Sequence, residues 1–405
     1  MNILIVNQPL NNRGDEAAHR SLINRLNIKF STANITVLFS NVNQNSINQI
    51  AVNSKQNKYI NINGFSRGSD FLMRWSLRLG LIRLSTLHPF HRQFANYIKK
   101  SDLIICAPGG ICMGLFQNWR HIYRLALALV YKKKIAYYSR SIGPFPTLTK
   151  WNRLFKKVSY YLLNHFDFIS LRDSKSMKLA DEIGISYVPS IDTAFLDTPR
   201  VEIPKTIRNQ INNNEYIVFV PNTLTWHPAF KNCPPEYLEK FYCSIIKLLF
   251  KDYPNVNILM LPQLFNLKDN GDYKYFMKLK KEVNSDRIIV LKDSYSSDIQ
   301  QTIISKAKLL IGARYHSVVF AINNEIPFVA LSYEHKISGL LKILDKEDTI
   351  YNMEKFGTEL PEIQSAIHEI RNILKLIKPD IEAKNKAKEI AQTCFFKLIQ
   401  KYNIA

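Results

Sequence analysis

The chain has 405 residues, of which 46% are hydrophobic, so it can bury sizeable cores and is expected to form two or three domains. Its 55 Lys and Arg residues outnumber 33 Asp and Glu residues, and the excess is concentrated in residues 65–160, which hold 17 basic and two acidic residues. This composition excludes a disordered chain, and the five scattered cysteines, without CxxC or zinc-type spacing, predict a reducing compartment and no metal site.

The N-terminal sequence MNILIVNQPLNNRGDEAA is expected to be the mature start of a cytoplasmic protein. It has neither the basic region nor the cleavage site of a signal peptide. Its apolar run is also far shorter than the roughly 18 residues that a membrane span requires.

The first half of the chain alternates strands and helices. Strands are predicted at 2–7, 35–40, 102–110, 134–145, 168–171 and 187–191, and helices at 15–28, 118–133, 151–166 and from Ser174 onward. Between the second and third strands lies a long variable stretch that ends in a basic amphipathic helix.

That basic helix is predicted over Asp70–Leu84, where Arg74, Arg78 and Arg83 alternate with Trp75 and leucines. The pattern is typical of a helix at a membrane surface or beside a lipid-linked phosphate. An ordinary surface helix with solvated arginines explains it equally well. Nucleic acid is not an expected partner, because the sequence contains no helix-turn-helix, RNP, KH or zinc-finger pattern.

The second half restarts the alternation, with strands at 216–221, 256–263, 287–291, 309–314 and 327–333 and helices between them. This order predicts an α/β protein with two Rossmann-like doubly wound parallel-sheet domains facing a cleft. The expected boundaries are 1–196 for a basic, acceptor-side domain, 197–215 for a polar linker, 216–358 for a donor-side domain, and 359–405 for helices that pack back on the first domain.

Residues 312–339, GARYHSVVFAINNEIPFVALSYEHKISG, form the most informative stretch. The runs LLIGA and PFVALSY are typical of buried strands, and the residues between them predict a crossover helix. In such a βαβ unit both strand ends open into one crevice, so Arg314, His316 and Lys336 are expected to converge there. These cations suit an anionic substrate that carries a phosphate or a carboxylate.

Polar residues and glycines also follow the predicted strands of the first half. They are Gly14, Asp15, Gly109, Gly110, Ser141, Arg172, Asp173 and Asp192. Because the carboxyl ends of parallel strands share one edge, we expect these residues to line a ligand-binding edge. Singly, each is also typical of a tight turn, a helix cap or a surface ion pair.

Several common enzyme motifs are absent from the sequence. P-loop, GxGxxG, GxSxG, HExxH and DxD patterns do not occur. The chemistry is therefore expected to depend on cations, a histidine and glycine-containing loops.

In chain order, the segments NNRGDEAA, APGGI, SIGPF, LRDSKSMKLADEIGI, IDTAF, GARYHSVVFA and IPFVALSYEHKISG resemble the polysaccharide pyruvyl transferase family, over roughly residues 3–345. The most specific parts are the R-x-H of Arg314–His316 and the S-Y-x-x-K of Ser332–Lys336. The chain departs from the family pattern at Ile111, where a third glycine is frequent, and at Ser139 and Arg140, where a Gly-Gln pair is common.

The resemblance implies a fold like that of GT-B glycosyltransferases. It also implies transfer of pyruvate from phosphoenolpyruvate, with no further cofactor, to two hydroxyls of a sugar as a cyclic ketal. The acceptor is expected in a surface-polysaccharide or lipid-linked oligosaccharide precursor, with peripheral membrane contact. The motifs add Asn12 and Tyr333 to the expected substrate-binding residues.

The assigned roles follow from the chemistry of the donor. Phosphoenolpyruvate carries a phosphate and a carboxylate, which Arg172, Lys336 and Arg314 are expected to bind. Ketal formation requires protonation of the methylene carbon, and we assign this proton transfer to His316 because an imidazole can gain and lose a proton near neutral pH. A GT-B glycosyltransferase that uses a nucleotide sugar is the alternative enzyme, and a basic scaffold that binds anionic glycolipid is the non-enzymatic one.

Overall fold

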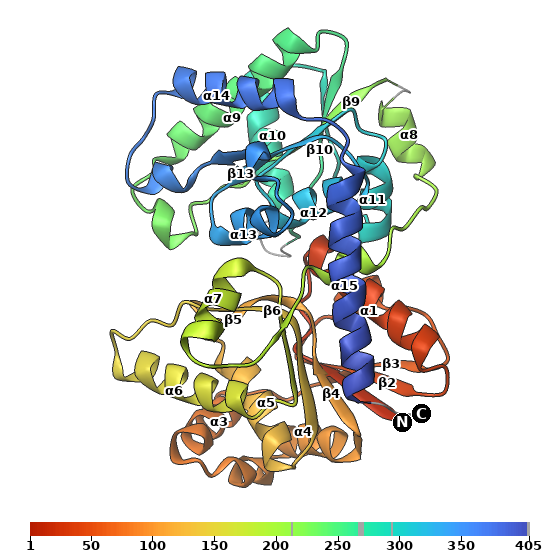
Figure 1. The fold of residues 1–405 in the computed structure, drawn as a ribbon, viewed down its shortest axis with the longest axis vertical. Coiled ribbons are helices and arrows are strands. Elements are labelled where there is room, and N and C mark those ends of the chain that lie inside the picture. The colour runs from red at the N-terminus through yellow and green to blue at the C-terminus, as the bar shows by residue number, and fades with distance from the viewer. Residues whose placement is uncertain (212–213, 266–270, 293–294, 403–405) are drawn as a thin grey trace. The chain divides into compact units, whose positions relative to one another are not determined.

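The structure is a computed structural model that describes residues 1–211, 214–265, 271–292 and 295–402. The chain forms two compact units, each a layered α/β arrangement (Figure 1). Unit 1 contains Met1–Leu10, Asp15–Leu196 and the segment from Glu389 onward, and unit 2 contains Asn11–Gly14 and Asp197–Lys388. The predicted class, two parallel-sheet α/β domains, is confirmed.

Unit 1 is built on a parallel sheet with the strand order β3-β2-β1-β4-β6-β7-β8, and β5 pairs with β6 beside it. The strands are β1 (Asn2–Val6), β2 (Asn34–Ser40), β3 (Asn57–Ile62), β4 (Leu103–Cys106), β5 (Gly109–Gly114), β6 (Lys134–Gly143), β7 (Phe168–Leu171) and β8 (Val188–Pro189). The central strands are apolar throughout because helices cover both faces of the sheet.

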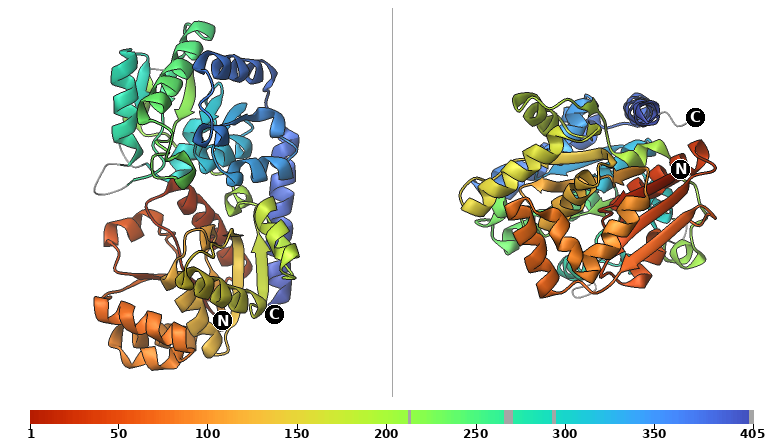
Figure 2. Two further views of the ribbon diagram at one scale, coloured as in Figure 1. Left: turned by 90° about the vertical axis from the view of Figure 1, so that its left-hand side faces the viewer. Right: turned by 90° about the horizontal axis from the view of Figure 1, so that it is seen from below.

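Alternate residues of β1 enter two different apolar cores. Leu4 and Val6 pack in a cluster with α3 (Arg67–Leu79), α4 (Pro89–Lys100), α5 (Trp119–Val130), α6 (Lys150–Asn164) and α7 (Ser174–Glu182). Ile3 and Ile5 pack in a second cluster with α1 (Arg13–Lys29), α2 (Gln44–Ile50) and the C-terminal part of α15 (Ile381–Lys401). Figure 2 shows these helices from two further directions.

The helix predicted as one segment over Asp70–Leu84 is divided in two. Helix α3 ends at Leu79, because Gly80 adopts the left-handed conformation with φ of 70° and caps it. A 3₁₀ helix, η1 (Ile82–Leu87), follows. Another short 3₁₀ helix, η2 (Thr193–Leu196), ends the Asp15–Leu196 part of unit 1.

Unit 2 contains a second parallel sheet with the order β11-β10-β9-β12-β13-β14. Its strands are β9 (Tyr216–Val220), β10 (Asn257–Met260), β11 (Ile288–Val290), β12 (Leu310–Gly312), β13 (Phe328–Ser332) and β14 (Ile350–Asn352). Its helices are α8 (Lys205–Ile211), η3 (Pro228–Phe230), α9 (Pro235–Asp252), α10 (Asp272–Val283), α11 (Ser297–Ile304), α12 (Tyr315–Asn323), α13 (His335–Ile343), η4 (Glu347–Thr349), η5 (Glu354–Gly357) and α14 (Ile363–Leu376).

Residues 197–215, expected as a linker, include helix α8 and are grouped with unit 2. Within this stretch, residues 212 and 213 lie outside the described residues. None of the helices in the described part of the chain combines the length and apolar character that crossing a bilayer requires.

Candidate functional site

Three neighbouring strands of unit 2 end at one edge of its sheet and carry the strongest candidate residues. Gly312 at the end of β12 pairs with Val220 of β9 and with Ala330 of β13. The loops that follow these strands therefore start side by side, and they hold Asn222, Arg314 and Tyr333 beyond the strand ends.

Arg314 is fixed by an ion pair with Asp272, the first residue of α10. The other carboxylate oxygen of Asp272, Oδ2, accepts hydrogen bonds from the backbone N–H groups of Gln263 and Leu264, each at 3.0 Å. Burial alone would lower the pKa of Arg314, but Asp272 and nearby tyrosines outweigh it and the net shift is upward. Arg314 is therefore a permanently charged group held in one place.

The Arg314 guanidinium does not use all of its hydrogen-bond donors within the described part of the protein. Its Nε atom is buried and has no hydrogen-bond partner among the described residues. Buried donors in proteins are nearly always paired, so an orphaned one in a charged side chain is typical of a site that an anion completes.

The segment Asn11–Gly14 is attached to the loop that follows β10. The N–H of Arg13 donates to the carbonyl of Gln263 at 3.0 Å, and the N–H of Phe265 donates to the carbonyl of Asn11 at 2.9 Å. The guanidinium of Arg13 also lies over the Phe265 ring, 4.8 Å from its centroid. Asp272 thus holds the same loop that positions this N-terminal segment.

His316 lies in the first turn of α12 and packs directly against Gly14. A Cβ placed on Gly14 would lie 1.7 Å from Cγ of His316, so the imidazole occupies space that only glycine leaves open. Asn12 supports this segment, because its Oδ1 accepts a hydrogen bond from the N–H of Gly14 at 2.8 Å. The structure therefore brings Asn12, Gly14, Arg314 and His316 into one connected arrangement.

A second group of polar side chains begins α13. Glu334 is its N-cap residue, and its carboxylate lies 3.0 Å from Nζ of Lys336 and 4.0 Å from Nε2 of His227. The Tyr333 ring packs edge-on against the His227 ring, with 5.6 Å between centroids. Lys336 therefore has a carboxylate partner, and the predicted Tyr333 lies beside His227, to which the sequence pattern assigns no role.

The surroundings of His227 and Tyr333 shift the pKa values of both side chains. Burial, opposed by Glu334 and aided by Lys336, lowers the pKa of His227, so this imidazole is neutral at neutral pH. Burial and the neighbouring Glu334 raise the pKa of Tyr333, which keeps its hydroxyl protonated. Both rings can donate or accept hydrogen bonds without carrying charge.

Asn222 is a residue that sequence reasoning missed. It follows β9, is fully buried, and neither its amide nitrogen nor its amide oxygen finds a hydrogen-bond partner in the described ranges. Burying an unpaired amide costs stability, so an unpaired Asn222 after β9, the strand that pairs with β12, favours a role toward a ligand. An asparagine after an apolar strand gives no distinguishing sequence signal.

In unit 1, Gly109 and Gly110 begin β5 and lie over the buried side chain of Arg140. The Arg140 guanidinium donates to the carbonyls of Ala107 at 2.5 Å and Gly110 at 3.0 Å, and to Sγ of Cys112 at 3.2 Å. The sequence marks Arg140 only as a departure from the family pattern, yet its hydrogen bonds hold the carbonyls of the glycine loop.

The remaining predicted residues of unit 1 take part in an ion pair, in a strand or at the start of a helix. Arg172 and Asp192 form a buried ion pair with 2.5 Å between Nη1 and Oδ2, so the charge of Arg172 is balanced within the protein. Ser141 is a buried residue within β6 rather than after it, and Asp15 lies in the first turn of α1. Asp173 caps α7 by accepting a hydrogen bond from the N–H of Ser176 at 2.8 Å.

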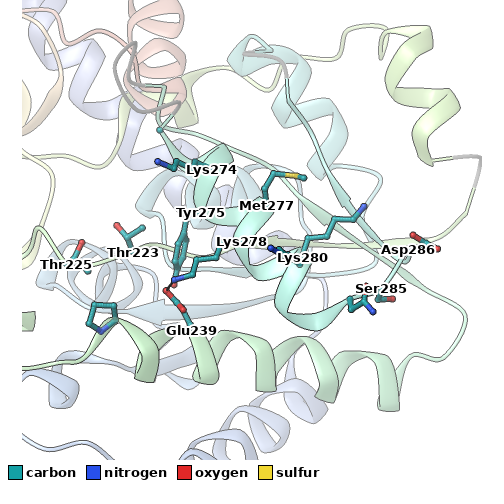
Figure 3. A pocket seen from close by; sticks show the side chains of 14 residues that line it. Thr223, Thr225, Glu239, Lys274, Tyr275, Met277, Lys278, Lys280, Ser285 and Asp286 are labelled. Atoms are coloured by element: carbon teal, nitrogen blue, oxygen red, sulfur yellow. Dashed lines mark hydrogen bonds and ion pairs between the residues drawn. The ribbon is translucent and has the colours of Figure 1, made fainter.

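A pocket of about 880 Å³ lies between α9 and α10 of unit 2 (Figure 3). Figure 3 shows the side chains of Lys274, Lys278 and Lys280 around it, and Lys278 pairs with Glu239. None of the site residues predicted from sequence lines this pocket. Within the described ranges, His, Cys, Asp and Glu side chains form no group of three that could hold a metal ion.

The sequence matches the family model described as polysaccharide pyruvyl transferase over residues 12–335. It is also similar to the amylovoran biosynthesis protein AmsJ of Erwinia amylovora, with 23% identity over 364 residues that cover 85% of this chain and 86% of AmsJ.

Solved structures with similar folds include an epimerase and a transferase. The UDP-GlcNAc 2-epimerase of Neisseria meningitidis has a TM-score of 0.58 and 11% identity, with 99% of this chain and all of that chain covered. A UGT transferase from Siraitia grosvenorii has a TM-score of 0.60 and 9% identity, with full coverage of both chains. At these identities the likeness establishes the fold, which is that of GT-B glycosyltransferases and epimerases.

Proposed function

Because the chain belongs to the polysaccharide pyruvyl transferase family, we propose that it transfers the pyruvyl group of phosphoenolpyruvate to two hydroxyls of one sugar, forming a cyclic ketal. The acceptor is a sugar in a cell-surface polysaccharide or lipid-linked oligosaccharide precursor. The observation that carries the proposal is the packing of His316 against Gly14 beside the charged, incompletely paired Arg314.

The arrangement suits a donor with two anionic groups. Arg314 presents a buried Nε donor, and its charge is fixed by Asp272. Lys336 lies in the first turn of α13, where backbone N–H groups add to its attraction for an anion. These groups would bind the phosphate and the carboxylate of phosphoenolpyruvate without requiring a metal ion.

The reaction requires a proton at the methylene carbon of the donor. His316 would supply it, which converts the methylene to a methyl group and leaves an oxocarbenium-like centre at C2. One sugar hydroxyl attacks this carbon and loses its proton. Departure of phosphate and attack by a second hydroxyl then close the ketal, so the products are the pyruvylated sugar and inorganic phosphate.

The direct test measures phosphate release from phosphoenolpyruvate by the wild type, by His316→Gln and by the control His165→Gln. His165 is exposed in unit 1, and the same substitution there leaves the proposed site intact. Acceptors that contain galactose, mannose or N-acetylmannosamine are supplied, and the mass of each product is determined. We expect phosphate release coupled to a mass gain of one pyruvyl group, reduced at least about 100-fold in His316→Gln only.

Two results would contradict the proposal. Equal turnover by wild type and His316→Gln would exclude His316 as the proton donor. Turnover of a nucleotide sugar, with no pyruvyl mass gain on any acceptor, would instead establish the glycosyltransferase alternative.

A further inference from the structure

Helix α3 of unit 1 has two apolar stripes, although only one of them packs inside the protein. Met73 and Leu77 are buried in the core of the unit. Phe71, Trp75 and Leu79 follow one another at intervals of four residues on the solvent side, where the Phe71 side chain is 70% exposed. A surface helix normally places charged and polar residues on that side, so an exposed apolar stripe there is unusual.

The next segment continues the apolar surface. Leu81, Leu84 and Leu87 are all exposed, and Leu87 reaches 70%. They recur every three residues from Leu81, the N-cap residue of η1, to Leu87 at its end, and a 3₁₀ helix has three residues per turn, so the leucines share one side. Helix α3 and η1 contact each other.

Helix α6 borders the same region. Trp151 and Tyr161 are exposed, and the Arg78 guanidinium of α3 lies 5.9 Å from the centre of the Trp151 ring. An apolar groove of about 470 Å³ separates α3 from α6, and Leu154 and Val158 line it. We call the surface formed by α3, Leu81, η1 and α6 the apolar-basic face. Its exposed apolar and aromatic residues are Phe71, Trp75, Leu79, Leu81, Leu84, Leu87, Trp151 and Tyr161.

The charge around this face is almost entirely positive. Arg78 and Lys157 line the groove itself, and Arg74, Arg83, Lys150 and Arg153 lie on the same three elements. Asp70 is the single acidic residue of α3, η1 and α6, and it is paired with Arg74 at 2.8 Å. The face therefore combines exposed large apolar side chains with unbalanced positive charge.

We propose that the apolar-basic face binds the surface of an anionic lipid bilayer. Leucine, phenylalanine and tryptophan side chains would enter the boundary between head groups and acyl chains, while the arginines and lysines bind lipid phosphates. A nucleic acid would leave the leucines against water, and an apolar protein partner would leave the cations without counter-charge. The proposal concerns unit 1 and does not depend on the reaction assigned to unit 2.

The test is co-sedimentation of the full chain with vesicles of phosphatidylcholine alone and of phosphatidylcholine with 30% phosphatidylglycerol. We expect binding to the anionic vesicles that is at least about tenfold stronger than to neutral ones and that falls as salt is raised. Binding that is equal on both vesicle types, or absent on both, would overturn the proposal.

Matched variants separate the two contributions. Phe71→Ser with Leu87→Ser removes two exposed apolar side chains, and Arg78→Gln with Lys157→Gln removes two charges; each pair should weaken binding at least about tenfold. The controls are Leu376→Ser with Phe396→Ser and Lys240→Gln with Lys247→Gln, which change equally exposed residues on α14, α15 and α9. Unchanged melting temperatures show that the variants fold. Equal losses in test and control variants would indicate non-specific adsorption and refute the assignment of this face.

Discussion

Gly14 leaves the space that the His316 imidazole fills, since a Cβ at residue 14 would lie 1.7 Å from Cγ of His316. The two residues are about 300 positions apart in the sequence, and hydrogen bonds between Asn11–Gly14 and the loop after β10 bring them together. The position of the proposed proton donor therefore depends on a residue without a side chain.

Replacing Gly14 by Ala should displace the His316 ring and reduce phosphate release at least about 100-fold, close to the effect of removing the imidazole. Because either the His316 side chain or the backbone at residue 14 must shift, the melting temperature of the variant is measured beside its activity. Gly68→Ala is the control, since a Cβ there meets only Oγ of Ser66, at 3.7 Å. Full activity in Gly14→Ala would contradict the role of this contact.

Replacing Asp272 by Asn removes the counter-charge of Arg314 and weakens the acceptor for two backbone N–H groups. We expect a loss of about 3 kcal/mol in the free energy of unfolding, measured in urea. The KM for phosphoenolpyruvate should rise about tenfold or more, with a smaller change in kcat, because a mobile Arg314 binds the donor less well. Glu236→Gln, at the exposed start of α9, should leave both quantities unchanged.

Asn222 allows a test in which stability and activity move in opposite directions. Its buried amide has no partner in the described part of unit 2, so Asn222→Leu should leave the free energy of unfolding unchanged or raise it by about 1 kcal/mol. If the amide binds substrate, the same variant should lose at least tenfold in kcat/KM. A loss of stability with unchanged kcat/KM would show that Asn222 serves only the fold.

Buried histidines predict an acid-sensitive unit 1. Burial, with a smaller effect from Arg20, lowers the pKa of His19 to about 3, while an unfolded histidine titrates near 6.5. Between these values the unfolded state binds the proton and the folded state does not, so stability falls as pH falls. The contribution of one such histidine is about 1.4 kcal/mol per pH unit below 6.5.

The measurement is urea unfolding at pH 7 and pH 5 for the wild type and His19→Gln. Glutamine can retain a hydrogen bond to the Tyr59 hydroxyl, which lies 3.2 Å from Nε2 of His19. The variant should lose less stability between the two pH values, whereas the exposed His165→Gln should behave like the wild type. Identical slopes in all three proteins would exclude His19 as a source of the pH dependence.

The fold class could be predicted from the sequence because the central strands are short, apolar and rich in β-branched residues. Strand β3, NKYINI, escaped prediction because polar residues interrupt it, and β5 because glycines begin and end it. The helix expected to continue to Leu84 ends earlier because Gly80 provides a left-handed cap.

The R-x-H and S-Y-x-x-K motifs were visible because they follow recognisable strands. The residues around these motifs could not be predicted, since the sequence shows Asp272 only as an acidic residue at the start of a helix and Asn222 only as a loop residue. The sequence also gives no sign of the hydrogen bond from Arg140 to the glycine loop. Their importance comes from contacts between distant segments, which local periodicity does not contain.

The chain passes between the two units four times, after Leu10, Gly14, Leu196 and Lys388. The segment from Glu389 onward is synthesised after unit 2, and it supplies Cys394 and Leu398 to the second apolar cluster of unit 1. A nascent chain therefore cannot complete the second apolar cluster of unit 1 before unit 2 has been translated, unlike a protein whose domains fold one after the other on the ribosome. Truncation of the last helix should consequently expose the core of the N-terminal unit and favour aggregation of the newly made protein.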